Sequence, residues 1–431
     1  MKKVTISIAL IIAMIAITPF ASVSASTDTI NRGEFFKLVV DHLEYDGSNV
    51  NVELPSDVAA NSPFANTVKV LKQKKIVVGF PDGSFKLDQK ITPVEASAVI
   101  SRILALKGED VSSKLAANYG VRFGDEKYLT SATAKAVVTK ALTSDKSARE
   151  LMDKMAVAQN EQISFKATSD MSMIMDMNLP DSESDGVPNP ITLDGSITMI
   201  FNKEKGMYQQ MKISMPLPEQ QEVSVEQYFV PEGIFMKIKD PITGQDQWMN
   251  MSEAMPFDFI ALMEMNEENL KMSQDLNNKY FIYKDLGLDE IAGKQLQKII
   301  FSGKIDSIEE VLGMMGNMLG DQSVLSSLEG LPNMTMSMNG TVWIDKETSL
   351  PYRQLMDYEI VYGQSNDPAM ASPIEKMNYE LDMIYSDFGQ VNEIVLPEEA
   401  LSAEVLPGLN QLEELEDAEY LENVEEPQPQ L

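Results

Sequence analysis

Two patterns of hydrophobic positions divide the chain near residue 145. Before it, apolar residues recur three and four apart, as at Ala96, Val99, Ile100 and Ile103, which is typical of a helix with one buried face. After it, apolar and polar residues alternate, most clearly over residues 165–177, which is typical of strands with one dry and one wet face. We therefore expect a small all-α bundle followed by an α+β domain with a large curved antiparallel sheet, covered by helices.

The helical region repeats one start signal. Thr92 and Glu95 stand three residues apart with Pro93 between them, so a capping box is predicted there. Asn31 and Glu34 repeat the signal. A third, shortened copy begins near residue 129, and the repeat predicts three related helices.

A glycine-bracketed turn, Gly-Phe-Pro-Asp-Gly at residues 79–83, precedes the helix capped by Thr92. Together with the helix start, this stretch resembles an S-layer homology module, and residues 28–144 resemble one complete and two partial modules. The resemblance implies a pseudo-threefold bundle that binds secondary cell wall polysaccharide in a Gram-positive wall. Arg32 keeps the arginine usual at the second helical position, where Pro93 and Ser131 replace it in the other copies, so at most one competent groove is implied.

The resemblance marks a set of candidate wall-polymer-binding residues. A planar guanidinium suits an anionic sugar, which favours Arg32. For Glu34, Glu95, Gly79 and Gly83, capping and turn geometry are an alternative explanation. The candidates are Arg32, Glu34, Asp57, Gly79, Phe80, Asp82, Gly83 and Glu95.

Composition excludes several classes of function. The 431 residues include 35 Lys and Arg against 66 Asp and Glu, for a net charge of −31, which disfavours nucleic-acid binding. There is no cysteine, and His42 is the one histidine. This excludes a thiol nucleophile and a zinc site built from cysteines, and it disfavours a catalytic triad. We expect no enzyme activity and no cofactor.

The first 25 residues have the pattern of a secretory signal peptide. Lys2 and Lys3 precede an apolar run over residues 4–17, and small residues end at Ala25. We expect cleavage there and an extracellular, wall-associated protein, with an uncut membrane anchor as the alternative.

Methionine dominates the alternating strands, and the chain contains 29. Flexible, polarizable side chains on one sheet face suit a hydrophobic groove, although they also fill cores. The expected groove residues are Phe165, Met171, Met173, Met175, Met207, Met211, Met215, Met334, Met336, Met338 and Met383.

Residues 147–401 resemble the lipoprotein-carrier (LolA-like) superfamily. The resemblance rests on the opening helix and strand, on Gly-Thr-Val-Trp-Ile-Asp at residues 340–345, and on Val-Leu-Pro-Glu-Glu-Ala at residues 395–400. It implies a half-barrel that holds a lipid or another hydrophobic ligand. Residues 402–431 are acidic and expected to be disordered.

The leading hypothesis is a wall-bound carrier of a hydrophobic ligand. The alternatives are a structural envelope protein without a ligand and a wall-acting hydrolase with paired carboxylates. Two metal hypotheses rank lower: calcium at residues 181–186 and Cu(I) on stacked methionines.

Overall fold

The computed structural model describes residues 28–48, 50–108, 110–178, 188–215, 221–239, 244–253, 267–305, 334–363 and 372–406. Outside these ranges lie the predicted signal peptide, the candidate calcium loop, the helix expected at residues 308–328 and the tail beyond residue 406. Within them, no helix combines the length and the hydropathy needed to cross a bilayer.

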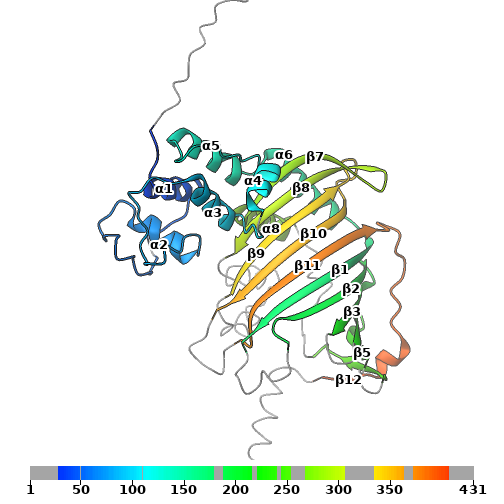
Figure 1. Cartoon of the computed structure of the whole chain (residues 1–431). Coiled ribbons are helices and arrows are strands. Elements are labelled where there is room, and N and C mark those ends of the chain that lie inside the picture. The colour runs from blue at the N-terminus through cyan, green and yellow to red at the C-terminus, as the bar shows by residue number, and fades with distance from the viewer. Residues whose placement is uncertain are drawn as a thin grey trace, which may run out of the picture.

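The N-terminal region is helical, and its main helices begin where the capping signals predict (Figure 1). Asn31 and Thr92 cap α1 and α3, and in each case the glutamate three residues on completes a capping box. Thr130 caps α5 in the third copy. The helices are α1 (Arg32–His42), α2 (Ala65–Gln73), α3 (Pro93–Ile103), α4 (Val111–Tyr119) and α5 (Ser131–Leu142).

Three equivalent positions of the repeat meet in the core of this region. The Ile30 amide donates to the Leu129 carbonyl (2.9 Å), Leu129 to Ile91 (3.0 Å), and Ile91 back to Ile30 (3.2 Å). All three side chains are buried. The bonds close a ring from which α1, α3 and α5 start, so the repeat has a structural counterpart even in its shortened third copy.

The C-terminal region is one twelve-stranded sheet in the order β12-β6-β5-β4-β3-β2-β1-β11-β10-β9-β8-β7. Its pairs are antiparallel except β12 with β6. The first strand, β1, lies at the centre, between β2 and β11. The strands are β1 (Ser164–Met177), β2 (Ile191–Asn202), β3 (Gly206–Met215), β4 (Gln221–Val230), β5 (Gly233–Lys239), β6 (Asp246–Asn250), β7 (Phe281–Ile291), β8 (Lys294–Ile305), β9 (Met334–Ile344), β10 (Pro351–Tyr362), β11 (Ile374–Ser386) and β12 (Glu404–Val405).

The expected antiparallel sheet is therefore confirmed, and two boundaries differ from those expected. The helix expected at residues 256–277 is described from Glu267 and continues to Tyr280, as α8 (Glu267–Tyr280). The sheet domain continues past residue 401, through the 3-10 helix η2 (Glu398–Ser402), because β12 pairs with β6.

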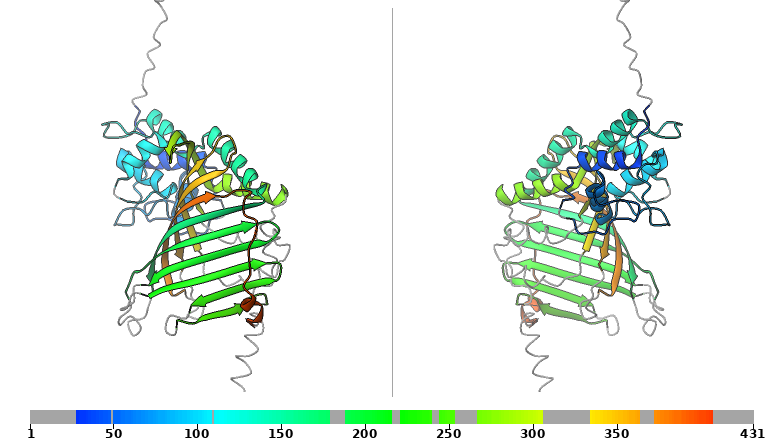
Figure 2. Two further views of the ribbon diagram at one scale, coloured as in Figure 1. Left: turned by 90° about the vertical axis from the view of Figure 1, so that its right-hand side faces the viewer. Right: turned by 90° about the vertical axis from the view of Figure 1, so that its left-hand side faces the viewer.

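Helices pack on both faces of the sheet. We call the face that meets α6 (Lys146–Asn160) and α8 the inner face and the opposite one the outer face. Phe301 of β8 belongs to the inner cluster with Met155 of α6, whereas its neighbour Ile300 is buried in the core of the helical region. Figure 2 shows that the sheet is curved, since β2 to β5 are seen broadside where β9 and β10 run at a steep angle.

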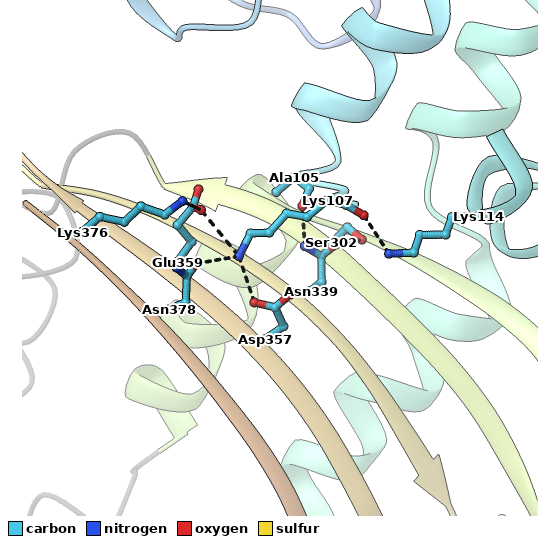
Figure 3. A network of polar contacts seen from close by, with 9 residues as sticks. All are labelled: Ala105, Lys107, Lys114, Ser302, Asn339, Asp357, Glu359, Lys376 and Asn378. Atoms are coloured by element: carbon cyan, nitrogen blue, oxygen red, sulfur yellow. Dashed lines mark hydrogen bonds and ion pairs between the residues drawn. The ribbon is translucent and has the colours of Figure 1, made fainter. Parts of the chain in front are cut away.

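Polar contacts join the helical region to the outer face (Figure 3). Lys107 donates to Asp357 (3.0 Å) and Asn378 (3.2 Å), and the Asn339 amide donates to the carbonyl of Ala105 (2.7 Å). The two regions thus share apolar and polar contacts, which the sequence pattern did not predict.

Candidate functional site

The candidate site is the inner face of the sheet, and the strand register assigns its residues. Directly opposite residues in an antiparallel pair share a face. Met171 lies opposite Leu381, Met173 opposite Leu193, and Met338 opposite Tyr358. The structure brings to this face the expected Phe165, Met171, Met173, Met175, Met207, Met211, Met334, Met336, Met338 and Met383. Met215 ends β3 opposite Gln221, and its side chain lies outside the described residues.

The same face has members that the list of expected groove residues did not include. Met356, Tyr358 and Ile360 of β10 alternate with charged and polar residues, so the period-two pattern over residues 354–362 was a usable signal. Further members are Met199, Ile197, Met236, Met249, Met377, Tyr379 and Tyr385.

Charge is segregated between the two faces. At the described inner-face positions of β1 to β5, β9 and β10, and of β11 from Met377 onward, no side chain carries a formal charge. The ionic residues stand at the alternate, outer positions. They include Lys166, Asp170, Asp176, Asp194, Lys212, Glu222, Glu226, Lys237, Lys239, Arg353, Asp357, Glu359, Lys376, Glu380 and Asp382.

Three tyrosines of the inner face have raised pKa values. Burial raises the pKa of Tyr385 to about 12, and burial also raises the pKa of Tyr358 and of Tyr379. The Tyr385 hydroxyl donates to the Gln354 side-chain oxygen (3.2 Å). At the described positions of β1 to β5 and β9 to β11 named above, the face therefore offers apolar surface with a few hydroxyl and amide groups and no formally charged side chain.

The inner face is partly covered. Met171 and Met383 are buried, with 4% and 8% of their surface exposed. Met173, Met175 and Met211 are half-buried. The side chains thus leave accessible apolar surface within the described part of the chain, which a fully packed core would not.

A cleft of about 560 Å³ lies elsewhere, at the junction of the helical region with the outer face. Lys107, Lys114 and Tyr119 line one side of it. The strands contribute four carboxylates, of which Asp357 is paired with Lys107 (3.0 Å) and Asp382 with Arg353 (2.5 Å). The carboxylates are Asp170, Asp357, Glu380 and Asp382.

Three of the predicted wall-binding residues, Glu95, Phe80 and Asp57, gather around a fourth, Arg32. Its guanidinium donates to Glu95 (2.6 Å) and to the Phe85 carbonyl (2.9 Å), and it stacks 4.7 Å from the centre of the Phe80 ring. Asp57 accepts from the Phe85 amide at 2.9 Å. Arg32 is only 6% exposed, and this burial lowers its pKa, while Glu95 and Asp57 oppose the shift.

The other predicted wall-binding residues have local roles. The Glu34 carboxylate accepts a hydrogen bond from the Asn31 backbone amide in the capping box (2.8 Å). Gly79 and Gly83 have positive φ angles of 81° and 76°, which glycine adopts without strain. The Asp82 carboxylate accepts from the Ser84 amide (3.0 Å) and hydroxyl, which lowers its pKa to about 2.

A family model matches residues 147–405, and its description reads "Family of unknown function (DUF6612)". The chain belongs to this family. The match runs from the start of α6 to β12, so it covers the inner face. It does not include the helical region, whose last helix, α5, ends at Leu142.

Comparison with other proteins is remote. No curated protein matches the chain. LprF from Mycobacterium bovis is similar over 59% of this chain and 99% of its own, at 14% identity and a TM-score of 0.31. A putative outer membrane lipoprotein-sorting protein domain from Vibrio parahaemolyticus is similar over 59% of this chain and 95% of its own, at 8% identity and a TM-score of 0.20. Likeness this distant carries no argument about function, which rests on the residues of the chain itself.

Proposed function

We propose that this chain is a non-enzymatic protein of the cell envelope that binds a long acyl chain or a similar apolar molecule on the inner face. The observation that carries the proposal is the segregation of charge. An uncharged, partly accessible face rich in methionine spans the central strands, and the ionic residues occupy the other side.

The size of the face suits an acyl chain. β1 has 14 residues, which corresponds to about 45 Å of strand. Burial contributes roughly 0.8 kcal/mol per CH₂ group, so a long chain can bind without a charged partner. A charged head group would stay at the rim, because desolvating it on this face would have no compensation.

The test is binding of a fluorescent fatty acid to the purified full chain, with native mass spectrometry for co-purified lipid. Met211→Lys places a charge on the inner face of β3, and Gln210→Lys places the same charge on its outer face. We expect the inner charge to weaken binding at least about tenfold and the outer charge to leave it unchanged. Circular dichroism checks that both variants fold.

The absence of any bound or binding lipid, or equal binding by the two variants, would contradict the proposal. A chain that attaches to walls but binds no apolar molecule would favour the structural alternative.

For the helical region we propose attachment to an anionic wall polysaccharide. The repeat ring and the cluster around Arg32 support this, with a sugar carboxylate taking the place that Glu95 now holds at the guanidinium. Co-sedimentation with walls, before and after removal of the secondary polysaccharide, is the test. Arg32→Gln should lose sedimentation, and Lys37→Gln on the exposed side of α1 should keep it. Retention by both variants would remove Arg32 from the site.

The carboxylate hydrolase remains the second candidate, and the outer cleft favours it. Asp170 and Glu380 are exposed there beside two ion-paired carboxylates. Sugar release from wall material, lost in Asp170→Asn or Glu380→Gln, would support a hydrolase, and no release would exclude it for that substrate.

A further inference from the structure

Two half-buried methionines of the inner face have a hydrogen-bond donor at their sulfur. The Tyr358 hydroxyl donates to Met356 Sδ at 2.9 Å, and the Gln227 amide donates to Met236 Sδ at 3.9 Å. A thioether is a weak acceptor, so these contacts add little stability by themselves. A sulfoxide at the same sulfur carries a strong acceptor oxygen within reach of the same donors.

The choice of methionine also needs a reason. Valine and isoleucine suit strands better, and they would give a face that is equally apolar. Methionine adds a sulfur that can be oxidised reversibly. Because the chain has no cysteine, its methionine thioethers are the only sulfur groups that can be oxidised.

We infer that Met236 and Met356 are oxidation sites and that their conversion to sulfoxides releases the apolar ligand. This inference rests on the proposed function of the inner face. The oxidant is a peroxide. The sulfur lone pair attacks one peroxide oxygen as the O–O bond breaks, which gives a hydroxysulfonium and a hydroxide. The hydroxide takes the proton from the oxygen now bound to sulfur, so the products are the sulfoxide and water. Sulfur loses two electrons, and the peroxide gains them.

The donors have two effects on this step. The Tyr358 hydroxyl can hydrogen-bond the departing hydroxide, which assists oxidation at Met356. Afterwards each donor can bond the sulfoxide oxygen, so the sheet need not bury an unsatisfied polar group. An acyl chain cannot donate a hydrogen bond to the sulfoxide oxygen. It therefore loses an apolar contact at each oxidised methionine and gains nothing in return.

Burial gives an internal comparison. Met171 also has a donor, the Tyr379 hydroxyl at 3.9 Å, but only 4% of Met171 is exposed. Peptide mass spectrometry of the peroxide-treated full chain should therefore show sulfoxide at Met356 and Met236 before Met171.

The decisive experiment measures fatty-acid probe affinity before and after hydrogen peroxide in three proteins. We expect roughly tenfold weaker binding in the wild type and a change under about twofold in Met236→Leu/Met356→Leu. The matched control, Met173→Leu/Met338→Leu, changes half-buried inner-face methionines that have no donor at sulfur among the described residues, and it should weaken like the wild type. Methionine sulfoxide reductases should restore the affinity.

Three results would overturn the inference while leaving the proposed function intact: unchanged affinity with both sulfoxides present, equal loss in the Met236→Leu/Met356→Leu variant, or loss of the far-ultraviolet circular dichroism on oxidation. A reduced wild type that binds no apolar probe would instead overturn the proposed function, and this inference with it.

Discussion

Arg32 shows how one side chain can join distant parts of the helical region. It pairs with Glu95 at 2.6 Å across two copies of the repeat, and its guanidinium lies 5.3 Å from the centre of the Phe36 ring and 4.7 Å from that of Phe80. The guanidinium is nearly buried, so its contacts with the protein compensate for lost hydration.

We expect Arg32→Gln to lower the free energy of unfolding by about 2 kcal/mol, because Glu95 loses its partner while remaining partly buried. A double-mutant cycle with Glu95→Gln should give a coupling of about 1 kcal/mol or more. Lys37→Gln, which breaks the exposed pair with Asp41, should cost under about 0.5 kcal/mol. Equal losses at Arg32 and Lys37 would show that burial adds nothing.

Tyr385 gives the inner face a pH dependence. Its pKa is raised to about 12 in the folded chain, whereas an unfolded tyrosine titrates near about 10. Between these values the unfolded chain gives up the proton and the folded chain keeps it. The stabilisation is therefore complete below about pH 10 and is lost as the pH rises toward 12.

We expect the free energy of unfolding of Tyr385→Phe to fall less steeply with pH over that window. The difference in slope should correspond to the release of about one proton. Denaturant titrations at a series of pH values measure this slope. The same slope in both proteins would mean that the phenol ionises equally in the folded and unfolded chains.

At the scale of elements, β9 depends on close packing over a glycine. A Cβ added at Gly340 would overlap the ring of Phe301 on the neighbouring strand, and that ring packs on Phe281 and Tyr283. The glycine therefore lets an aromatic ring cross the face of β9.

Gly340→Ala should cost about 1 to 3 kcal/mol, since the Phe301 ring has to move within its cluster. Thermal unfolding measures the cost. Gly124→Ala, where the nearest contact of an added Cβ is 3.9 Å, should change stability by less than about 0.5 kcal/mol. Phe301→Leu should relieve the effect at Gly340; if it does not, the overlap is not its cause.

At the scale of the whole molecule, the helical region and the sheet share a core. Ile300 of β8 is 5% exposed and lies in the cluster formed by the N-terminal helices. The Tyr119 hydroxyl meets the Ser302 hydroxyl across the same junction. The chain should consequently unfold in one transition, with its two regions together.

Ile300→Asn should lower the midpoint of that transition and cost about 3 kcal/mol, because it buries an amide without partners in the shared core. Ile384→Asn is the control, since Ile384 lies on the same outer face but is 44% exposed, and it should cost under about 0.5 kcal/mol. Calorimetry distinguishes the outcomes. Two separate transitions in the unmodified chain would contradict a shared core.

The linker between the regions also protects the sheet. The Asp145 backbone amide donates to the Tyr283 carbonyl (2.9 Å). The Asp145 carboxylate accepts from the Asp285 amide, and the Ser144 hydroxyl accepts from the Tyr283 amide. These bonds occupy part of the free edge of β7, where another strand would otherwise add.

Local signals in the sequence determined the helix starts and the faces of the strands. Capping at Asn31, Thr92 and Thr130 depends on side chains within three residues, and the methionine faces depend on a period of two, so both are readable without the fold. Such signals do not reveal how distant segments pair.

Only the tertiary structure decided which strands are neighbours, that β1 pairs with β11, and that the helical region packs on the outer face at β7 and β8. It also gave Arg32 its partner Glu95 and brought four carboxylates to one cleft. The physical reason is that these contacts join residues far apart in sequence, and their stability depends on apolar area and ion pairs that exist only once the chain has closed on itself.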